Sequence, residues 1–296
     1  PKTNRKKRDD IQGLRGIAIL AVVFYHCDLV YNGYFGVDIF FALSGFLMAK
    51  ILSRNESLTP LVTIDFYIRR LKRIIPLYCI LLLVLTIVAP FVFIPIAMPD
   101  YLYALKLAMF ISEYLLTGIG MPRFALIHLW SLSIEMQYYL LVPFIIIVSR
   151  RFPKGNAQFG FFAILFFASY SICISDLPDF HPLYLSARAF QFIIGSIVHI
   201  APPSSKLPSN IYTSLLCSTV TILLVILCFI PVVIHPALGR LLVTLLTGFL
   251  LHAGSTVQSI LLTNRPLVYI GDLSYVIYLV ELPIHEILLY LSIKHQ

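Results

Sequence analysis

The chain has 296 residues, of which 59% are hydrophobic and only 12% are charged, and its mean hydropathy is +0.90. A soluble domain is nearer to half apolar and a quarter charged, so this composition around a water-soluble core would leave large apolar patches in water. It excludes a soluble globular protein, a disordered chain and a disulfide-stapled secreted module. Because each membrane span takes about 20 residues, nine spans leave short loops and no room for a second, soluble domain.

Nine apolar runs have the lengths of membrane-spanning helices. They cover residues 14–31, 35–52, 74–96, 128–149, 158–174, 184–201, 211–234, 238–256 and 268–292. The segment 101–118 is amphipathic and carries Lys106 and Glu113, so it is the weakest candidate for a crossing. Helices satisfy their own backbone in lipid, and no alternating pattern of a transmembrane barrel is present. We predict an all-α, polytopic bundle of about nine to ten spans, forming a single domain over residues 1–296.

The formal net charge of +8 arises from 22 Lys and Arg residues against 14 Asp and Glu residues. The basic residues lie in short clusters between apolar runs, which favours loops at a membrane face over a nucleic-acid surface. If the runs alternate and 101–118 stays outside, most of these residues fall on the side of the N-terminus. The outer side then receives only Lys106, Arg123, Arg240 and Lys294. The positive-inside rule predicts an integral, multi-pass protein with a cytoplasmic N-terminus, in contact with the lipid bilayer and no nucleic acid.

Ionisable side chains within the first runs are candidates for function, because each costs at least about 2.5–3.5 kcal/mol to insert. Arg15 and His26 are eleven positions apart, which places them on one helix face about 16 Å apart. The alternative is an arginine that reaches lipid headgroups and an unrelated buried histidine.

The second run carries Asp38 and Ser44. Asp38, Ala42 and Gly45 share one helix face, and small residues of this kind suit a close helix contact. Asp38 near the outer end could orient a histidine on a neighbouring helix or could serve only to join helices.

Four positive charges, on Arg69, Arg70, Lys72 and Arg73, lie in a predicted inner loop at the start of a helix. Guanidinium groups match phosphate geometry, so the cluster suits a multiply phosphorylated cytosolic ligand. A positive-inside anchor or a lipid-headgroup site is the alternative.

Further ionisable groups lie in later runs. Ser131, Glu135 and Tyr138 or Tyr139 share a helix face, where a buried carboxylate could bind sugar hydroxyls, tune a nearby histidine or only join helices. Arg188 lies within a span and is expected to pair with a carboxylate, whereas Glu281 lies toward the outer side. The histidines lack metal-ligand spacing, so no metal is predicted.

Six blocks of sequence resemble the acyltransferase-3 family of integral membrane proteins, which O-acylate glycans, lipids and related acceptors. The blocks are IQGLRGIAILAVVFYH (11–26), GYFGVDIFFALSGFLM (33–48), FYIRRLKRIIPLY (66–78), WSLSIEMQYYLLVPF (130–144), LYLSARAFQFIIG (183–195) and LSYVIYLVELP (273–283). The arginine and histidine that the family pairs fall on Arg15 and His26, and its Arg-x-x-Arg motif falls on Arg70 and Arg73. The order of the blocks is that of the family.

The resemblance implies an O-acyltransferase that uses cytosolic acyl-CoA, usually acetyl-CoA, as donor substrate and holds no bound cofactor. The CoA phosphates would dock on Arg69, Arg70 and Arg73, and Arg15 would guide the donor. His26 would act as general base or acyl carrier for a hydroxyl of a glycan or lipid acceptor. Asp38 or Glu135 would orient its imidazole.

Two departures from the family pattern bear on this expectation. Val280-Glu281-Leu282-Pro283 stands where many members read a Trp-His-Trp-Pro-like sequence, so Glu281 replaces a histidine. The family core has about ten spans, so either 101–118 crosses or a final C-terminal helix is missing. The same buried charges would also suit a transporter of an anionic or acylated solute, or an inactive family member that binds lipid.

Overall fold

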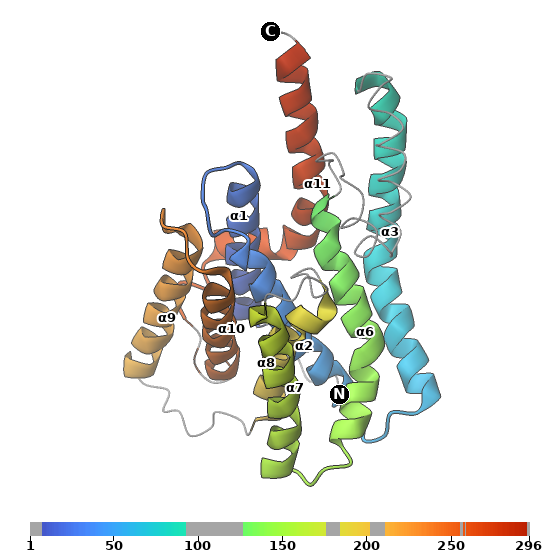
Figure 1. Cartoon of the computed structure of the whole chain (residues 1–296), viewed down its shortest axis with the longest axis vertical. Coiled ribbons are helices and arrows are strands. Elements are labelled where there is room, and N and C mark those ends of the chain that lie inside the picture. Colours follow the sequence, from blue (N-terminus) through green and yellow to red (C-terminus); the bar gives the residue numbers. More distant parts are fainter. Residues whose placement is uncertain are drawn as a thin grey trace. The chain divides into compact units, whose positions relative to one another are not determined.

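The computed structural model describes residues 8–92, 127–175, 184–201, 211–254, 257 and 259–294, and all regular structure in these residues is helical (Figure 1). The elements are α1 (Asp9–His26), α2 (Phe35–Leu52), α3 (Pro60–Val92), η1 (Ile127–Leu129), α6 (Trp130–Ser149), α7 (Asn156–Ile174), α8 (Leu185–Ile200), α9 (Ile211–Phe229), α10 (Pro236–Ala253) and α11 (Arg265–Lys294). The all-α prediction is confirmed, and a helix lies on each of the nine predicted runs. The segment 101–118 lies outside the described residues.

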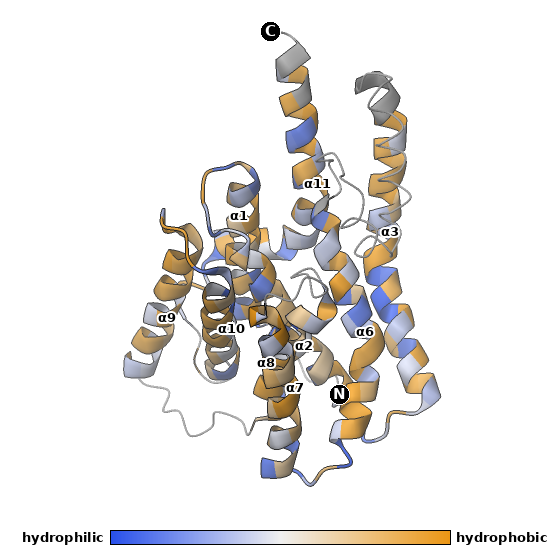
Figure 2. Cartoon of the chain, viewed as in Figure 1, coloured by the Kyte–Doolittle hydropathy of each residue, from blue (hydrophilic) through white to orange (hydrophobic). Residues whose placement is uncertain are grey.

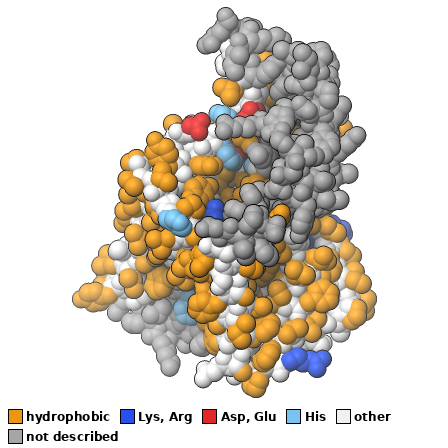
Figure 3. Space-filling view, viewed as in Figure 1, with side chains coloured by type: hydrophobic (Ala, Val, Ile, Leu, Met, Phe, Trp, Pro, Cys, Tyr) orange, Lys and Arg blue, Asp and Glu red, His pale blue; other side chains and the backbone are white. Residues whose placement is uncertain are grey.

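Seven of the described helices are long and apolar enough to cross a membrane: α2, α3, α6, α7, α9, α10 and α11. The helix α1 carries Asp9, Asp10 and Arg15, and α8 has only 16 residues, so neither meets the same measure of length and composition. Hydrophobic side chains also cover most of the described surface that faces the viewer in Figure 3. These observations support an integral, multi-pass membrane protein, whereas the count of nine to ten spans and the cytoplasmic N-terminus stay predictions.

The chain forms two compact units. Unit 1 comprises residues 1–50 and 190–275, and unit 2 comprises residues 51–189 and 276–296. In unit 1, α9 and α10 pack side by side, and α1 also contacts α9 (Figure 1). In unit 2, α6 packs against both α3 and α7.

Helices α2 and α8 approach each other closely in unit 1 because glycine stands at two contact points. A Cβ atom added at Gly45 would overlap the carbonyl oxygen of Phe192, and one at Gly195 would overlap that of Ala42. The hydroxyl of Ser196 donates to the carbonyl oxygen of Gly45 at 3.3 Å across the same contact. The close helix contact predicted for the Asp38 face of α2 is therefore confirmed.

The turn between α1 and α2 is fixed by Asn32, which is fully buried. Its amide donates to the carbonyl oxygens of Ile230 and Val232 at 3.2 and 2.7 Å, and its oxygen accepts from the backbone N–H of Ile234 at 3.2 Å. One side chain thus satisfies three backbone groups of the turn between α9 and α10. This contact holds the end of unit 1 that carries His26 and Tyr34.

Candidate functional site

In unit 1, the helix α1 carries both Arg15 and His26, as predicted, and His26 is its last residue. Both side chains are half-buried. The ring of Tyr25 lies 5.7 Å from that of His26 and 5.5 Å from that of Tyr34, measured between centroids. His26 therefore lies at the start of a short run of aromatic rings that leads into α2.

Asp38 is fully buried in α2 and accepts a hydrogen bond from the side-chain amide of Gln191 in α8. Gln191 is itself fully buried, and a buried carboxylate needs such a donor to offset its loss of water. The sequence analysis missed Gln191, although a glutamine within an apolar run three residues after Arg188 was a usable signal. Orientation of a histidine by Asp38 stays a prediction, as does a role for Ser44, which is buried on the same helix.

A second cation, Arg240, lies in the first turns of α10 in unit 1. Its guanidinium carbon lies 5.8 Å from the centroid of the Tyr34 ring, within the range of a cation–π interaction. The sequence placed Arg240 only among the outer charges and assigned it no site.

In unit 2, the basic cluster lies within a helix and not in a loop, because α3 begins at Pro60, well before the cluster. Thr59 accepts a hydrogen bond from the backbone N–H of Val62 at 3.4 Å, and proline suits the first helical position. Arg69 forms an i, i+4 ion pair with Asp65 at 2.5 Å, which supports the helix further. Figure 2 shows the hydrophilic residues of α3 gathered in the half that begins at Pro60.

The three arginines predicted to bind phosphate differ in their surroundings. Arg69 and Arg73 are exposed, whereas Arg70 is half-buried and lies over the ring of Phe66 at 5.9 Å. Phe66, Arg70 and Ile74 form part of the stripe of α3 that is turned away from solvent. Of the three arginines, Arg70 is thus the one that packs against the protein, through the ring of Phe66.

Glu135 lies in α6, which packs on α3 in unit 2. Its carboxylate accepts a hydrogen bond from the hydroxyl of Tyr139, one turn along the same helix, and its charge is close enough to act on Arg70. The hydroxyl of Tyr67 also joins the two helices, since it donates to the carbonyl oxygen of Leu140 at 2.9 Å. The predicted face of Ser131, Glu135 and Tyr139 is therefore a polar strip, and its role in catalysis stays a prediction.

Around the start of α6, unit 2 buries a second polar group. The hydroxyl of Tyr278 donates to the carbonyl oxygen of His128, and because it has one proton it accepts from the hydroxyl of Ser131 at 2.6 Å. The imidazole of His128 packs edge-on against the Tyr278 ring at 5.1 Å. The sequence did not reveal this contact, because Tyr278 lies 150 residues away from His128.

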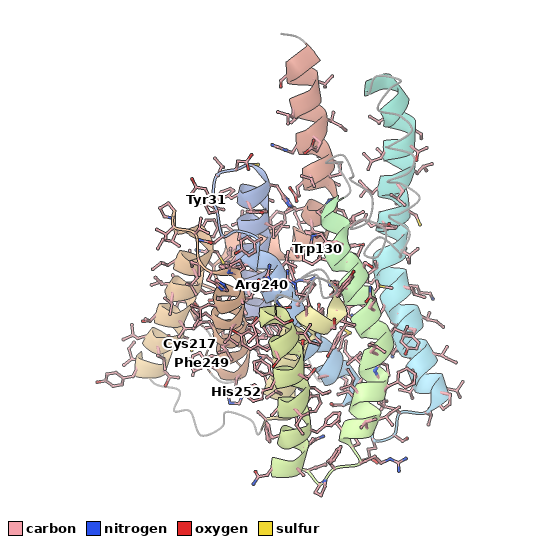
Figure 4. All side chains as sticks on the ribbon, in the orientation of Figure 1. Tyr31, Trp130, Cys217, Arg240, Phe249 and His252 are labelled. Atoms are coloured by element: carbon pink, nitrogen blue, oxygen red, sulfur yellow. The ribbon has the colours of Figure 1, made fainter. Side chains whose placement is uncertain are left out.

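Arg188 and Glu281 are the remaining predicted residues, and both lie in unit 2. Arg188 is only 3% exposed, and its guanidinium lies 5.3 Å from the ring centroid of Trp130, which is labelled in Figure 4. Glu281 is half-buried, and its charge is close enough to act on Tyr278. A carboxylate partner for Arg188 stays a prediction. Over the described residues, no three His, Cys, Asp or Glu side chains gather as metal ligands would.

A family model described as an acyltransferase domain, that of the acyltransferase-3 family, matches residues 8–296. The peptidoglycan O-acetyltransferase OatA of Listeria monocytogenes is 31% identical over 320 residues, which cover 95% of this chain and 50% of OatA. The Bacillus subtilis protein named "Putative peptidoglycan O-acetyltransferase YrhL" is 29% identical over 311 residues, which cover 93% of this chain and 48% of that protein.

The chain spans about half the length of the curated relatives it matches. No solved structure matches it. The family model, however, covers all the described helices and all six blocks of sequence that carried the resemblance. The chain therefore belongs to the acyltransferase-3 family.

Proposed function

We propose that the chain is a membrane-embedded O-acyltransferase that moves an acetyl group from acetyl-CoA on the cytosolic side to a hydroxyl group of a glycan on the other side. The observation that carries the proposal is the family match over residues 8–296. Since OatA and YrhL are named for peptidoglycan, a peptidoglycan hydroxyl is the first acceptor to test. The family assignment favours this activity over the transporter that the sequence left open.

The basic cluster of α3 is the proposed site for the phosphates of CoA. Arg70 packs on the ring of Phe66, and Glu135 is close enough for its charge to act on Arg70. The side chains of Arg69 and Arg73 are exposed. Clustered guanidinium groups bind phosphate oxygens through paired hydrogen bonds. Arg15 would guide the thioester arm, because it lies on the same helix as His26 and nearer to the N-terminus.

His26 is the proposed general base, because an imidazole titrates near neutral pH. It takes the proton of the acceptor hydroxyl while the oxygen attacks the thioester carbonyl carbon. The C–O bond forms, the C–S bond breaks, and the CoA sulfur leaves with the proton that the imidazolium returns. In an acyl-carrier route, the imidazole nitrogen attacks the thioester carbon, the C–S bond breaks, and the CoA sulfur leaves with the imidazole proton. The acceptor hydroxyl then attacks the acyl carbon, the C–N bond breaks, and the hydroxyl proton returns to the imidazole.

The test uses the full chain, purified into phospholipid nanodiscs, with acetyl-CoA labelled in the acetyl group and a soluble peptidoglycan fragment. The unsubstituted protein and His235→Gln, a change at an exposed histidine in the same unit, should transfer the label to the fragment. His26→Ala should transfer none above background. Full transfer by His26→Ala would remove His26 from the mechanism, and a lack of transfer by the unsubstituted protein would remove the proposed activity.

A further inference from the structure

Arg240 of unit 1 carries a buried hydrogen-bond donor in its side chain. Its Nε atom is buried, yet no acceptor for it lies among the residues that the structure describes, and no carboxylate there forms an ion pair with it. Its guanidinium carbon lies over the face of the Tyr34 ring, 5.8 Å from the ring centroid. A buried donor without an acceptor destabilises a fold, and more so if it is charged, so the presence of this donor calls for an explanation.

The packing of α10 fixes Arg240 in this place. A Cβ atom added at Gly239 would overlap the ring of Phe35, so α10 lies directly against the start of α2. The ring of Phe35 in turn contacts that of Tyr34 at 4.5 Å. Asn32 joins the adjoining turns through its hydrogen bonds to Ile230 and Val232. Arg240 is therefore positioned by the packing of α10 on the Phe35 ring and not by a flexible loop.

Arg240 also lies at the same end of unit 1 as His26. Its guanidinium packs on Tyr34, Tyr34 contacts Tyr25, and Tyr25 contacts His26, with centroid distances of 5.5 and 5.7 Å for the two ring pairs. Figure 4 shows Arg240 toward one end of α10 and His252 toward the other. The charge pattern of the sequence predicts that this is the outer end of α10.

The chemistry of an arginine held in this way suits an anion. A guanidinium that rests on an aromatic face keeps the N–H groups at its edge available, and these pair with carboxylate or phosphate oxygens. We infer that Arg240 is an acceptor-positioning residue, which binds a carboxylate or phosphate group of the acceptor while the hydroxyl to be acylated lies near His26. This inference rests on the proposed function, because it assigns the ligand to the acceptor side of that reaction.

The experiment compares two acceptors that differ only in charge. The first is a soluble peptidoglycan fragment with free carboxylates, and the second is the same fragment with those carboxylates converted to amides. Arg240→Gln should raise KM for the charged fragment about tenfold or more, the loss expected for one hydrogen bond to a charged group. KM for the amidated fragment and for acetyl-CoA should not change. Arg240→Lys keeps the positive charge but lacks the planar guanidinium, so its KM for the charged fragment should lie between those of the unsubstituted protein and Arg240→Gln.

Arg265→Gln is the matched control, because Arg265 belongs to the same unit and is exposed. It should leave all three KM values unchanged. Equal KM values for Arg240→Gln and the unsubstituted protein would overturn the inference while the proposed function stands. An equal loss on both fragments would also overturn it, because the effect would then not depend on the anion.

Two further measurements are needed. The first distinguishes an anion of the acceptor from the phosphate of a lipid, and the second distinguishes failure of the Arg240 inference from failure of the proposed acetyl transfer. The KM effect should persist in maltoside micelles, which carry no phosphate, and an effect confined to phospholipid nanodiscs would assign Arg240 to a lipid headgroup and overturn the inference. The charged fragment should also raise the thermal unfolding temperature of the unsubstituted protein and not that of Arg240→Gln. If that shift occurs without any acetyl transfer, the anion site of Arg240 stands and the proposed reaction fails. If neither the shift nor transfer occurs, both are wrong.

Discussion

Asp38 and Gln191 are both fully buried, and a hydrogen bond between their side chains joins α2 and α8 near the start of α2. Periodicity predicted a helix for each residue but could not pair them, because 153 residues separate them along the chain. The carboxylate was found from the sequence as an isolated charge in an apolar run. Its amide partner was missed because glutamine carries no charge.

Gln191→Ala should destabilise the protein, because it leaves the Asp38 carboxylate buried without this amide donor. We expect a loss of about 1–3 kcal/mol or more in unfolding free energy, measured by thermal unfolding in detergent. Gln158→Ala is the control, because Gln158 is half-buried in unit 2 and its hydrogen bonds are long, at 3.5 Å. If Gln191→Ala costs no more than Gln158→Ala, the pair contributes little to stability.

At the scale of elements, α3 shows why a run of charges misleads. Arg69, Arg70, Lys72 and Arg73 in five residues are typical of a loop at a membrane face, yet the helix continues through them from Pro60. The ion pair from Asp65 to Arg69 and the burial of Phe66 and Ile74 supply the helical periodicity that the charges mask. The same arginines are still predicted to bind phosphate, and the structure adds that Arg70 lies on a helix face and not in a loop.

The contact between α2 and α8 makes a second prediction at this scale. Gly45→Ala should separate the two helices, because its Cβ atom would overlap backbone and not a movable side chain. We expect a loss of about 1–3 kcal/mol in unfolding free energy, as for other overpacked contacts, together with loss of acetyl transfer.

Gly160→Ala in α7 is the matched control for this change. Nothing lies within 4 Å of a Cβ atom added at Gly160, so alanine should stabilise the helix there by roughly 0.5–1 kcal/mol. Thermal unfolding of both variants in the same detergent compares them directly. Equal behaviour of the two would mean that the close approach of α2 to α8 is not required for stability.

At the scale of the whole molecule, the sequence predicted where the helices lie but not how they are paired. Apolar runs of sufficient length fix the positions of helices, because the backbone must satisfy itself in lipid. Contacts such as Asn32 with the turn between α9 and α10, or Tyr278 with His128, join residues 150 or more positions apart. The periodicity of a short stretch of sequence carries no information on contacts between distant residues. The sequence therefore predicted only that Arg240 is a charge on the outer side, and not that it packs on Tyr34.

The orientation predicted from the basic residues can be tested through Cys27, a free and exposed cysteine beside His26. A variant that keeps Cys27 alone among its cysteines should react with a membrane-impermeant maleimide added to intact cells, because this end of α1 is predicted to face outward. In the same background without Cys27, Arg265→Cys should react only after the membrane is permeabilised. The reverse pattern would place the N-terminus outside.

The Asp38–Gln191 contact also has a consequence for the synthesis of the protein. At about 5–20 residues per second, the ribosome makes Gln191 roughly 8 to 30 s after Asp38. The buried carboxylate must therefore be accommodated in the insertion machinery, or reach the lipid interface, until α8 arrives. The delay is longer for Asn32, because its hydrogen-bond partners Ile230 and Val232 are synthesised 198 and 200 residues later. Unit 1 is thus completed only when its second segment, residues 190–275, has been made, so a nascent chain that stops before α8 carries the Asp38 carboxylate without the amide donor of Gln191.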